Sequence, residues 1–135
     1  MRAPLAPPPK LLLVDDDPAV RESLKFSLEL EGFAVDAFDS GETVVACHML
    51  ARYACLVLDY RLPGIDGLSL LGVLREHGET CPAVIITSNP TRAMRQRTAD
   101  AGAVLIEQPL LSDSLTTAIR QLIHGANPAT SSGLD

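Results

Sequence analysis

Short, mostly apolar segments alternate along the chain with longer segments of helical periodicity. Five segments of three to five residues have the pattern of strands, at Leu11–Val14, Phe33–Ala37, Cys55–Leu58, Ala83–Thr87 and Val104–Ile106. Each stretch between them is long enough for a helix. Alternation of this kind is typical of a parallel sheet with helices on both faces. The pattern therefore predicts an α/β fold with five strands and five helices.

Capping residues and glycines mark the ends of the predicted helices. Asp17 and Pro18 suit the N-cap and the first position of a helix that runs to about Glu31. The last helix, Leu115–Ile123, has the clearest amphipathic spacing, with apolar residues at i, i+3, i+4, i+7 and i+8. The second and third helices are predicted from Ser40 to about Leu50, and through Leu70, Leu71 and Leu74 to Gly78.

The fourth predicted helix, about Thr91–Ala101, differs from the others because it has few apolar residues. Only three alanines and Met94 are apolar, and Arg92, Arg95 and Arg97 lie among them. A helix of this composition buries little of its surface. Two interpretations remain open, a solvated charged face or a segment that moves during function.

Composition indicates one soluble domain. The 135 residues are 47% hydrophobic and 21% charged, which suffices for a single core. We expect residues 10–124 to form the domain, and residues 1–9 and 125–135 to be flexible tails. No segment is apolar over the ~18 to 20 residues of a membrane span, and no signal peptide is evident, so we expect a cytoplasmic location. The net charge of −6 argues against nucleic acid as a partner.

Polar residues follow the longer predicted strands at their carboxyl ends, where ligands bind in open parallel sheets. Asp15, Asp16 and Asp59 brought together there would repel one another unless a cation or a proton intervened. Mg²⁺ prefers such oxygen ligands and often binds beside a phosphate, and a carboxylate in this setting can attack phosphorus. The full set of polar residues at strand ends is Asp15-Asp16-Asp17, Asp59, Thr87-Ser88-Asn89 and Glu107-Gln108-Pro109.

These residues carry a resemblance to a known family. The segments LLLVDDDPAVRESL, LVLDYRLPGIDGLSLL, AVIITSN and AGAVLIEQP make the chain from Lys10 to about His124 similar to the receiver domains of two-component response regulators. The resemblance implies a flavodoxin-like, doubly wound parallel sheet in the strand order 2-1-3-4-5. It also implies a phosphoacceptor rather than an enzyme, whose partner is a sensor histidine kinase or a phosphotransfer protein.

The resemblance implies roles position by position. Asp59 would accept the phosphoryl group, and Asp15, Asp16 and Asp59 would bind Mg²⁺ together with the backbone carbonyl of Arg61. Thr87 would be the switch hydroxyl that moves toward a phosphoryl oxygen. The remaining implied positions are Pro63 and Gly67, which shape the loop after the acceptor, and Arg61 and Asn89, whose variable side chains tune the lifetime of the acyl phosphate.

Two positions depart from the family pattern. Gln108 stands where the family has a lysine that pairs with the phosphoryl group, and Leu105 stands where it usually has Tyr or Phe. Glutamine can donate a hydrogen bond but brings no charge, and charge-assisted bonds are roughly twice as strong as neutral ones. Neither Lys10 nor Lys25 is near the fifth strand in sequence, and for Arg92 a solvated side chain is a simpler interpretation than a replacement cation. We expect an intact acceptor site with an altered switch.

Three functional hypotheses follow. The leading one is a stand-alone phosphoacceptor that signals through protein contacts, with a possible homodimer through the fourth helix, fifth strand and fifth helix. The second is a degenerate receiver that binds partners without regulated phosphorylation. The third is a Mg²⁺ phosphohydrolase, but haloacid-dehalogenase enzymes have a second aspartate where Arg61 stands. A flavodoxin-type FMN site is weaker still, because the first strand-to-helix loop is acidic.

Overall fold

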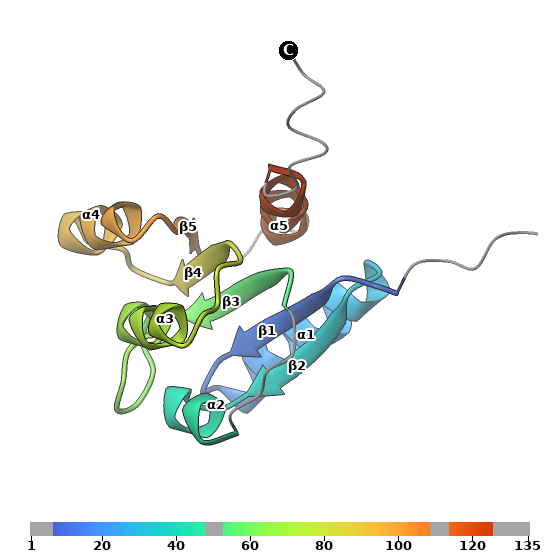
Figure 1. The fold of residues 1–135 in the computed structure, drawn as a ribbon, viewed down its shortest axis with the longest axis horizontal. Helices are drawn as coiled ribbons and strands as arrows, with labels where there is room; N and C mark the ends of the chain where they lie inside the picture. Colours follow the sequence, from blue (N-terminus) through green and yellow to red (C-terminus); the bar gives the residue numbers. More distant parts are fainter. Residues whose placement is uncertain (1–6, 48–52, 109–113, 126–135) are drawn as a thin grey trace, which may run out of the picture.

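A five-stranded parallel sheet forms the centre of the molecule, with the strand order β2-β1-β3-β4-β5 (Figure 1). The computed structural model describes residues 7–47, 53–108 and 114–125. The predicted α/β class, the number of strands and helices and the strand order are all confirmed. Because β1 lies between β2 and β3, the chain reverses its direction of winding there, and a crevice forms at the carboxyl ends of β1 and β3.

The elements have the following bounds. The strands are β1 (Lys10–Val14), β2 (Ala34–Phe38), β3 (Cys55–Asp59), β4 (Ala83–Thr87) and β5 (Val104–Glu107). The helices are α1 (Pro18–Leu30), α2 (Gly41–Cys47), α3 (Gly67–Glu76), α4 (Arg92–Asp100) and α5 (Ser114–Gly125).

Two apolar clusters, one on each face of the sheet, make up the core. Alternate residues of a strand point to opposite faces, so Leu12 packs with α2 and α3, and Leu13 packs with α1 and α5. Strands β1, β3 and β4 are covered on both faces, and their apolar residues are almost fully buried. This double coverage explains why these strands are continuous apolar runs rather than alternating ones.

The helices α1 and α2 begin at the polar residues that the sequence analysis places at their starts. The Asp17 carboxylate caps α1 by accepting hydrogen bonds from the amides of Ala19 and Val20, at 2.9 and 3.3 Å. The Ser40 hydroxyl accepts a hydrogen bond from the Thr43 amide at 3.1 Å, at the start of α2. The predicted end of this helix near Leu50 lies outside the described residues, as do most of the predicted tails.

Helix α4 buries only Met94 and Thr98, whereas α3, with a similar length, buries five residues. The prediction that α4 buries little is therefore confirmed. Instead, two of its arginines contact other elements. The Arg95 guanidinium lies 3.5 Å from the Glu107 carboxylate, and the Arg97 guanidinium donates a hydrogen bond to the Tyr60 hydroxyl. Arg97 also lies 3.9 Å from the Asp66 carboxylate.

We expect the amides of α4 to exchange with solvent roughly tenfold or more faster than those of α3, because few buried contacts oppose local opening. Hydrogen exchange followed by NMR measures both helices in one sample, so that α3 is the internal control. Equal protection of the two helices would contradict a marginally stable α4.

No described helix has the length and apolar content that a membrane span requires. Cys55 and Cys81 are free, and burial raises the pKa of their thiols to about 12 and about 11. Thiols that stay protonated at neutral pH are poor nucleophiles and metal ligands. These two cysteines therefore contribute packing rather than chemistry.

Candidate functional site

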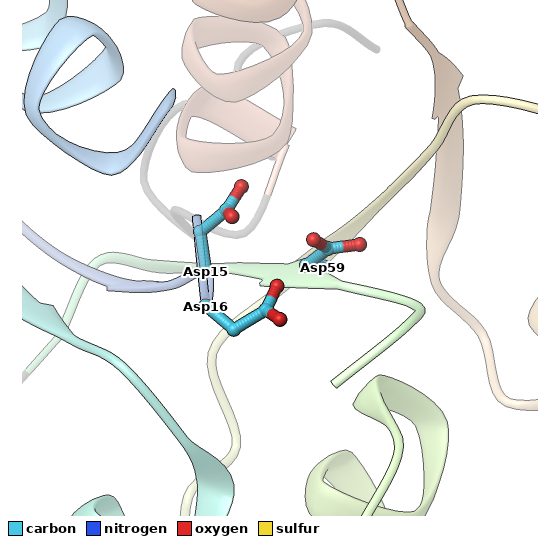
Figure 2. A group of neighbouring side chains, drawn as sticks. All are labelled: Asp15, Asp16 and Asp59. Carbon is cyan, nitrogen blue, oxygen red and sulfur yellow. The ribbon is translucent and has the colours of Figure 1, made fainter. Parts of the chain in front are cut away.

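Three carboxylates lie together at the carboxyl ends of β1 and β3, the two neighbouring central strands. Asp15 and Asp16 follow the last residue of β1, and Asp59 is the last residue of β3 (Figure 2). One oxygen from each of the three side chains lies within 4.8 Å of the other two. The structure thus brings together the three residues that the sequence analysis places at one site.

Asp15 is almost completely buried, with 1% of its surface exposed. Its Oδ1 atom accepts a hydrogen bond from the Asp17 amide at 3.0 Å, and its backbone carbonyl accepts one from the Arg21 guanidinium at 2.8 Å. Its Oδ2 atom has no hydrogen-bond partner among the described residues. Burial raises the pKa of the Asp15 carboxyl, although the Asp17 amide opposes this shift.

Asp59 is held beside the acidic pair by its backbone and by the loop that follows. The Tyr60 amide donates to the Ile86 carbonyl at 2.8 Å, which ties the end of β3 to β4. The Asp59 Oδ1 atom accepts a hydrogen bond from the Arg61 amide at 3.1 Å. Burial, reinforced by the charges of Asp15 and Asp16, raises the pKa of Asp59 to about 7.

A cavity of about 280 Å³ opens over the three carboxylates. The loop after β3 contributes Arg61 to its wall, and the segment after β5 contributes Gln108. Arg92 and Asn89 are exposed and do not line it. The complete lining is Asp15, Asp16, Asp17, Val20, Asp59, Arg61, Ser88 and Gln108.

Thr87 and Leu105 lie near the site without lining the cavity. Thr87 is 1% exposed, and its hydroxyl has no hydrogen-bond partner among the described residues. Its carbonyl accepts a hydrogen bond from the Gln108 amide at 2.7 Å, which fixes the main chain of Gln108 against β4. Leu105 is half-buried beside Ile85 of β4 and packs against the cluster beneath α3.

The loop after Asp59 comes so close to the strand that only glycine fits at its end. A Cβ atom on Gly67 would lie 2.3 Å from the backbone oxygen of Asp59. The Gly67 amide donates to the Tyr60 carbonyl at 3.0 Å, and the Asp66 side chain caps α3 by accepting from the Ser69 amide at 2.8 Å. The start of α3 is therefore packed directly on the backbone of Asp59.

The site fits a hard divalent cation. The donor set is three carboxylates, and one of them carries a buried oxygen, Asp15 Oδ2, without a partner among the described residues. Buried polar atoms without partners are costly unless a ligand or water satisfies them. Burial, and after it the charges of Asp15 and Asp16, raise the pKa of Asp59, so its ionised form is disfavoured without a counter-charge. A cation with a preference for oxygen ligands, such as Mg²⁺, relieves both deficits.

The sequence analysis gives no role to one polar residue of the cavity lining, Ser88. Ser88 lies one residue beyond Thr87 among the strand-end polar residues. Arg61, for which the resemblance implies a backbone role and a tuning role, also lines the cavity. The spacing of Arg61 two residues after Asp59 was the available signal.

A model of the family described as "Response regulator receiver domain" matches residues 11–120. Among curated proteins, the transcriptional regulatory protein FixJ of Bradyrhizobium diazoefficiens is 33% identical over 90% of this chain and 60% of its own length. The response regulator MprA of Mycobacterium leprae is 37% identical over 88% of this chain and 53% of its own length. The chain therefore spans little more than half the length of these relatives.

The chain is also similar to solved structures. Full-length FixJ from B. japonicum superposes with a TM-score of 0.82 at 33% identity, over 92% of this chain and 62% of that chain. The chemotaxis protein CheY4 of Vibrio cholerae superposes with a TM-score of 0.79 at 20% identity, over 85% of this chain and 98% of that one. The second comparison supports the fold alone.

Proposed function

Since the chain belongs to the response regulator receiver domain family, we propose that it accepts a phosphoryl group on Asp59 from a histidine-phosphorylated protein in a Mg²⁺-dependent reaction. Receiver domains act in two-component signalling as partners of histidine kinases, and this chain carries the acidic cluster of a receiver. The observation that carries the proposal is the convergence of Asp15, Asp16 and Asp59 within 4.8 Å, at the mouth of an open cavity.

Asp15, Asp16 and Asp59 would hold the Mg²⁺ ion, together with the backbone carbonyl of Arg61. When bound, the ion neutralises the carboxylates and the oxygens of the transferred group. The chain itself supplies the positions of these ligands. Asp15 is oriented by the Asp17 amide at 3.0 Å, and Asp59 by the Arg61 amide at 3.1 Å.

In the proposed transfer, a carboxylate oxygen of Asp59 forms a bond to phosphorus. The bond from phosphorus to the donor, a histidine nitrogen or the acyl oxygen of acetyl phosphate, breaks at the same centre, and the donor leaves with that electron pair. The Arg61 amide already occupies Oδ1 of Asp59 at 3.1 Å, which favours Oδ2 as the attacking atom. No further covalent step on the protein is needed.

The buried hydroxyl of Thr87 supports its proposed role as the switch. Thr87 Oγ1 has no hydrogen-bond partner among the described residues, and a phosphoryl oxygen on Asp59 would provide an acceptor for it. In this proposal, Gln108 contacts the phosphoryl group with a neutral amide, and Leu105 replaces an aromatic ring. The surface formed by α4, β5 and α5 stays a predicted dimer contact.

The proposal is tested by intact mass spectrometry after incubation with acetyl phosphate. With Mg²⁺ present, we expect the wild-type chain to gain the mass of one phosphoryl group, and with EDTA we expect no gain. Hydroxylamine should remove the added group, because it cleaves acyl phosphates and leaves phosphoserine and phosphothreonine intact. A histidine-phosphorylated phosphotransfer domain serves as a second donor.

Failure of both donors to add mass in the presence of Mg²⁺ would contradict phosphoacceptance. That outcome would favour the alternative of a degenerate receiver that binds its partners without phosphorylation. A mass gain that survives hydroxylamine would place the group on a residue other than an aspartate.

A further inference from the structure

The charges that line the cavity are strongly unbalanced. Among the described lining residues, four are aspartates and one, Arg61, is cationic. The two other polar lining residues, Ser88 and Gln108, are neutral. A phosphoryl group that enters this cavity brings further negatively charged oxygens next to the aspartates, and each of them needs a hydrogen-bond donor or a positive charge.

The other cationic side chains are engaged elsewhere or lie outside the cavity. Neither lysine lines it, and Lys10 lies 3.7 Å from Asp36. Arg92 is exposed and lies outside its lining. The remaining described arginines have partners, which are the Asp15 carbonyl for Arg21, the Glu79 and Cys81 carbonyls for Arg75, Glu107 for Arg95, Tyr60 and Asp66 for Arg97, and Glu31 for Arg120.

Among the described arginines, Arg61 is the one that lines the cavity. It is exposed, and its guanidinium has no hydrogen bond or ion pair with any described residue. Its backbone is fixed next to Asp59 by the 3.1 Å hydrogen bond from its amide to Oδ1. The backbone of Arg61 is therefore held beside Asp59, and its guanidinium has no partner among the described residues.

We propose that the Arg61 guanidinium is the cationic ligand of the phosphoryl group during transfer to Asp59, in the role that the neutral Gln108 does not fill. This inference rests on the proposed phosphoacceptor function and names a further catalytic residue for it. The guanidinium is planar and carries a fork of N–H donors that matches two phosphoryl oxygens. The guanidinium would donate hydrogen bonds to the phosphoryl oxygens and form no covalent bond. The bond that forms joins Asp59 to phosphorus, and the bond that breaks joins phosphorus to the donor.

The first test compares rates of phosphorylation by acetyl phosphate at saturating Mg²⁺, followed by intact mass. We expect Arg61→Gln to be about tenfold slower than wild type, as follows from the loss of one hydrogen bond to a charged group. Arg61→Lys should retain most of the rate, because it keeps the charge. The matched control is Arg92→Gln, which removes the same charge from an exposed arginine outside the cavity and should react at the wild-type rate.

The second test measures Mg²⁺ affinity by calorimetric titration without a phosphodonor. A guanidinium in the cavity repels the divalent ion, so Arg61→Gln should bind Mg²⁺ about threefold more tightly than wild type. Slower phosphorylation together with tighter Mg²⁺ binding is the signature of a charge that acts on the phosphoryl group. Disruption of the loop would instead weaken both.

The third test places Arg61→Gln in a Gln108→Lys background. A lysine at position 108 supplies a second cation, so the Arg61→Gln substitution should slow phosphorylation there by less than threefold, a non-additive result. We also expect Gln108→Lys alone to raise the rate of phosphorylation above that of wild type.

The outcomes separate this inference from the function on which it rests. A wild-type rate in Arg61→Gln, or weaker Mg²⁺ binding in that variant, would overturn the role of the guanidinium and leave phosphoacceptance standing. Absence of any mass gain in the wild type and in every variant would overturn both.

Discussion

Protein in which asparagine replaces Asp59 is expected to gain no phosphoryl group from acetyl phosphate or from a histidine-phosphorylated donor. An amide oxygen is a far weaker nucleophile than a carboxylate, and the other two aspartates of the cluster are directed at the cation in the proposed site. The hydrogen bond from the Arg61 amide can persist, because asparagine keeps an oxygen in the Oδ1 position. The loss should therefore be chemical rather than structural.

The same substitution is expected to stabilise the metal-free protein at pH 8. The folded-state pKa of Asp59 is raised from 3.8 to about 7, so the folded protein binds a proton more tightly than the unfolded chain does. Stability linked to this group is present below pH 4 and falls as the pH rises from about 4 to about 7. The Asp59→Asn protein does not lose this stability, because asparagine does not ionise. Its stability advantage over the wild type should disappear below pH 4.

We expect an advantage of about 1 to 2 kcal/mol at pH 8, less than the full shift implies, because the cavity is open to water that screens the charges. Thermal or urea unfolding in EDTA at pH 8 and pH 4 measures it. The matched control is Glu29→Gln, which removes the same charge from an exposed position on α1. Equal changes in stability from the two substitutions, or a gain that persists at pH 4, would show that the ionised Asp59 carboxylate does not destabilise the folded protein.

Addition of Mg²⁺ should reverse the order of stability. In the proposed site, the ion would bind the folded wild type through all three carboxylates and would stabilise it by mass action. The Asp59→Asn protein lacks one ligand, so its melting temperature should rise less with Mg²⁺ than that of the wild type. Parallel shifts in the two proteins would argue that Asp59 does not bind the ion.

Alanine at Gly67 is expected to cost about 2 to 4 kcal/mol of stability, the range for overpacking that the backbone must absorb. Its Cβ atom would lie 2.3 Å from the Asp59 backbone oxygen and 3.2 Å from the Cα atom of Tyr60. Neither is the end of a flexible side chain. Either α3 must move away from β3, or the end of β3, which carries Asp59, must shift.

The same helix provides the matched control for this prediction. A Cβ atom on Gly72 meets no atom within 4 Å, so alanine there should stabilise α3 by about 0.5 to 1 kcal/mol through its higher helix propensity. Denaturant unfolding of both variants gives the two free energies, and Mg²⁺ titration of Gly67→Ala should show weakened binding. Equal and small effects at the two glycines would contradict a close approach at Asp59.

The elements could be predicted from sequence because their signals are local. The apolar runs of β1, β3 and β4 are buried on both faces, so they carry no polar interruption. Helix α1 begins where Asp17 can cap it. Boundaries were displaced by a residue or two where the chain turns, as in β2, which begins at Ala34 because Phe33 closes the end of α1 through a hydrogen bond to Leu28.

The site could be predicted only in part, because its side chains come from loops whose course depends on tertiary packing. The positions of Asp15, Asp16 and Asp59 follow from strand ends and parallel pairing. That Thr87 is buried and outside the cavity lining, while Ser88 lines the cavity, depends on where β4 ends. The direction of the Arg61 side chain depends on the loop between Asp59 and Gly67, and no periodicity in the sequence describes that loop.

The hydrogen bond from the Gln108 amide to the Thr87 carbonyl has an evolutionary consequence. At 2.7 Å it holds the main chain of residue 108 in place, and it needs nothing from the side chain. Glutamine and lysine codons differ by a single base, so a lineage can lose or regain a cation at this position in one mutation without rebuilding the fold. The signalling behaviour of such a protein can therefore change faster than its architecture, and relatives with nearly identical cores can respond differently to the same phosphodonor.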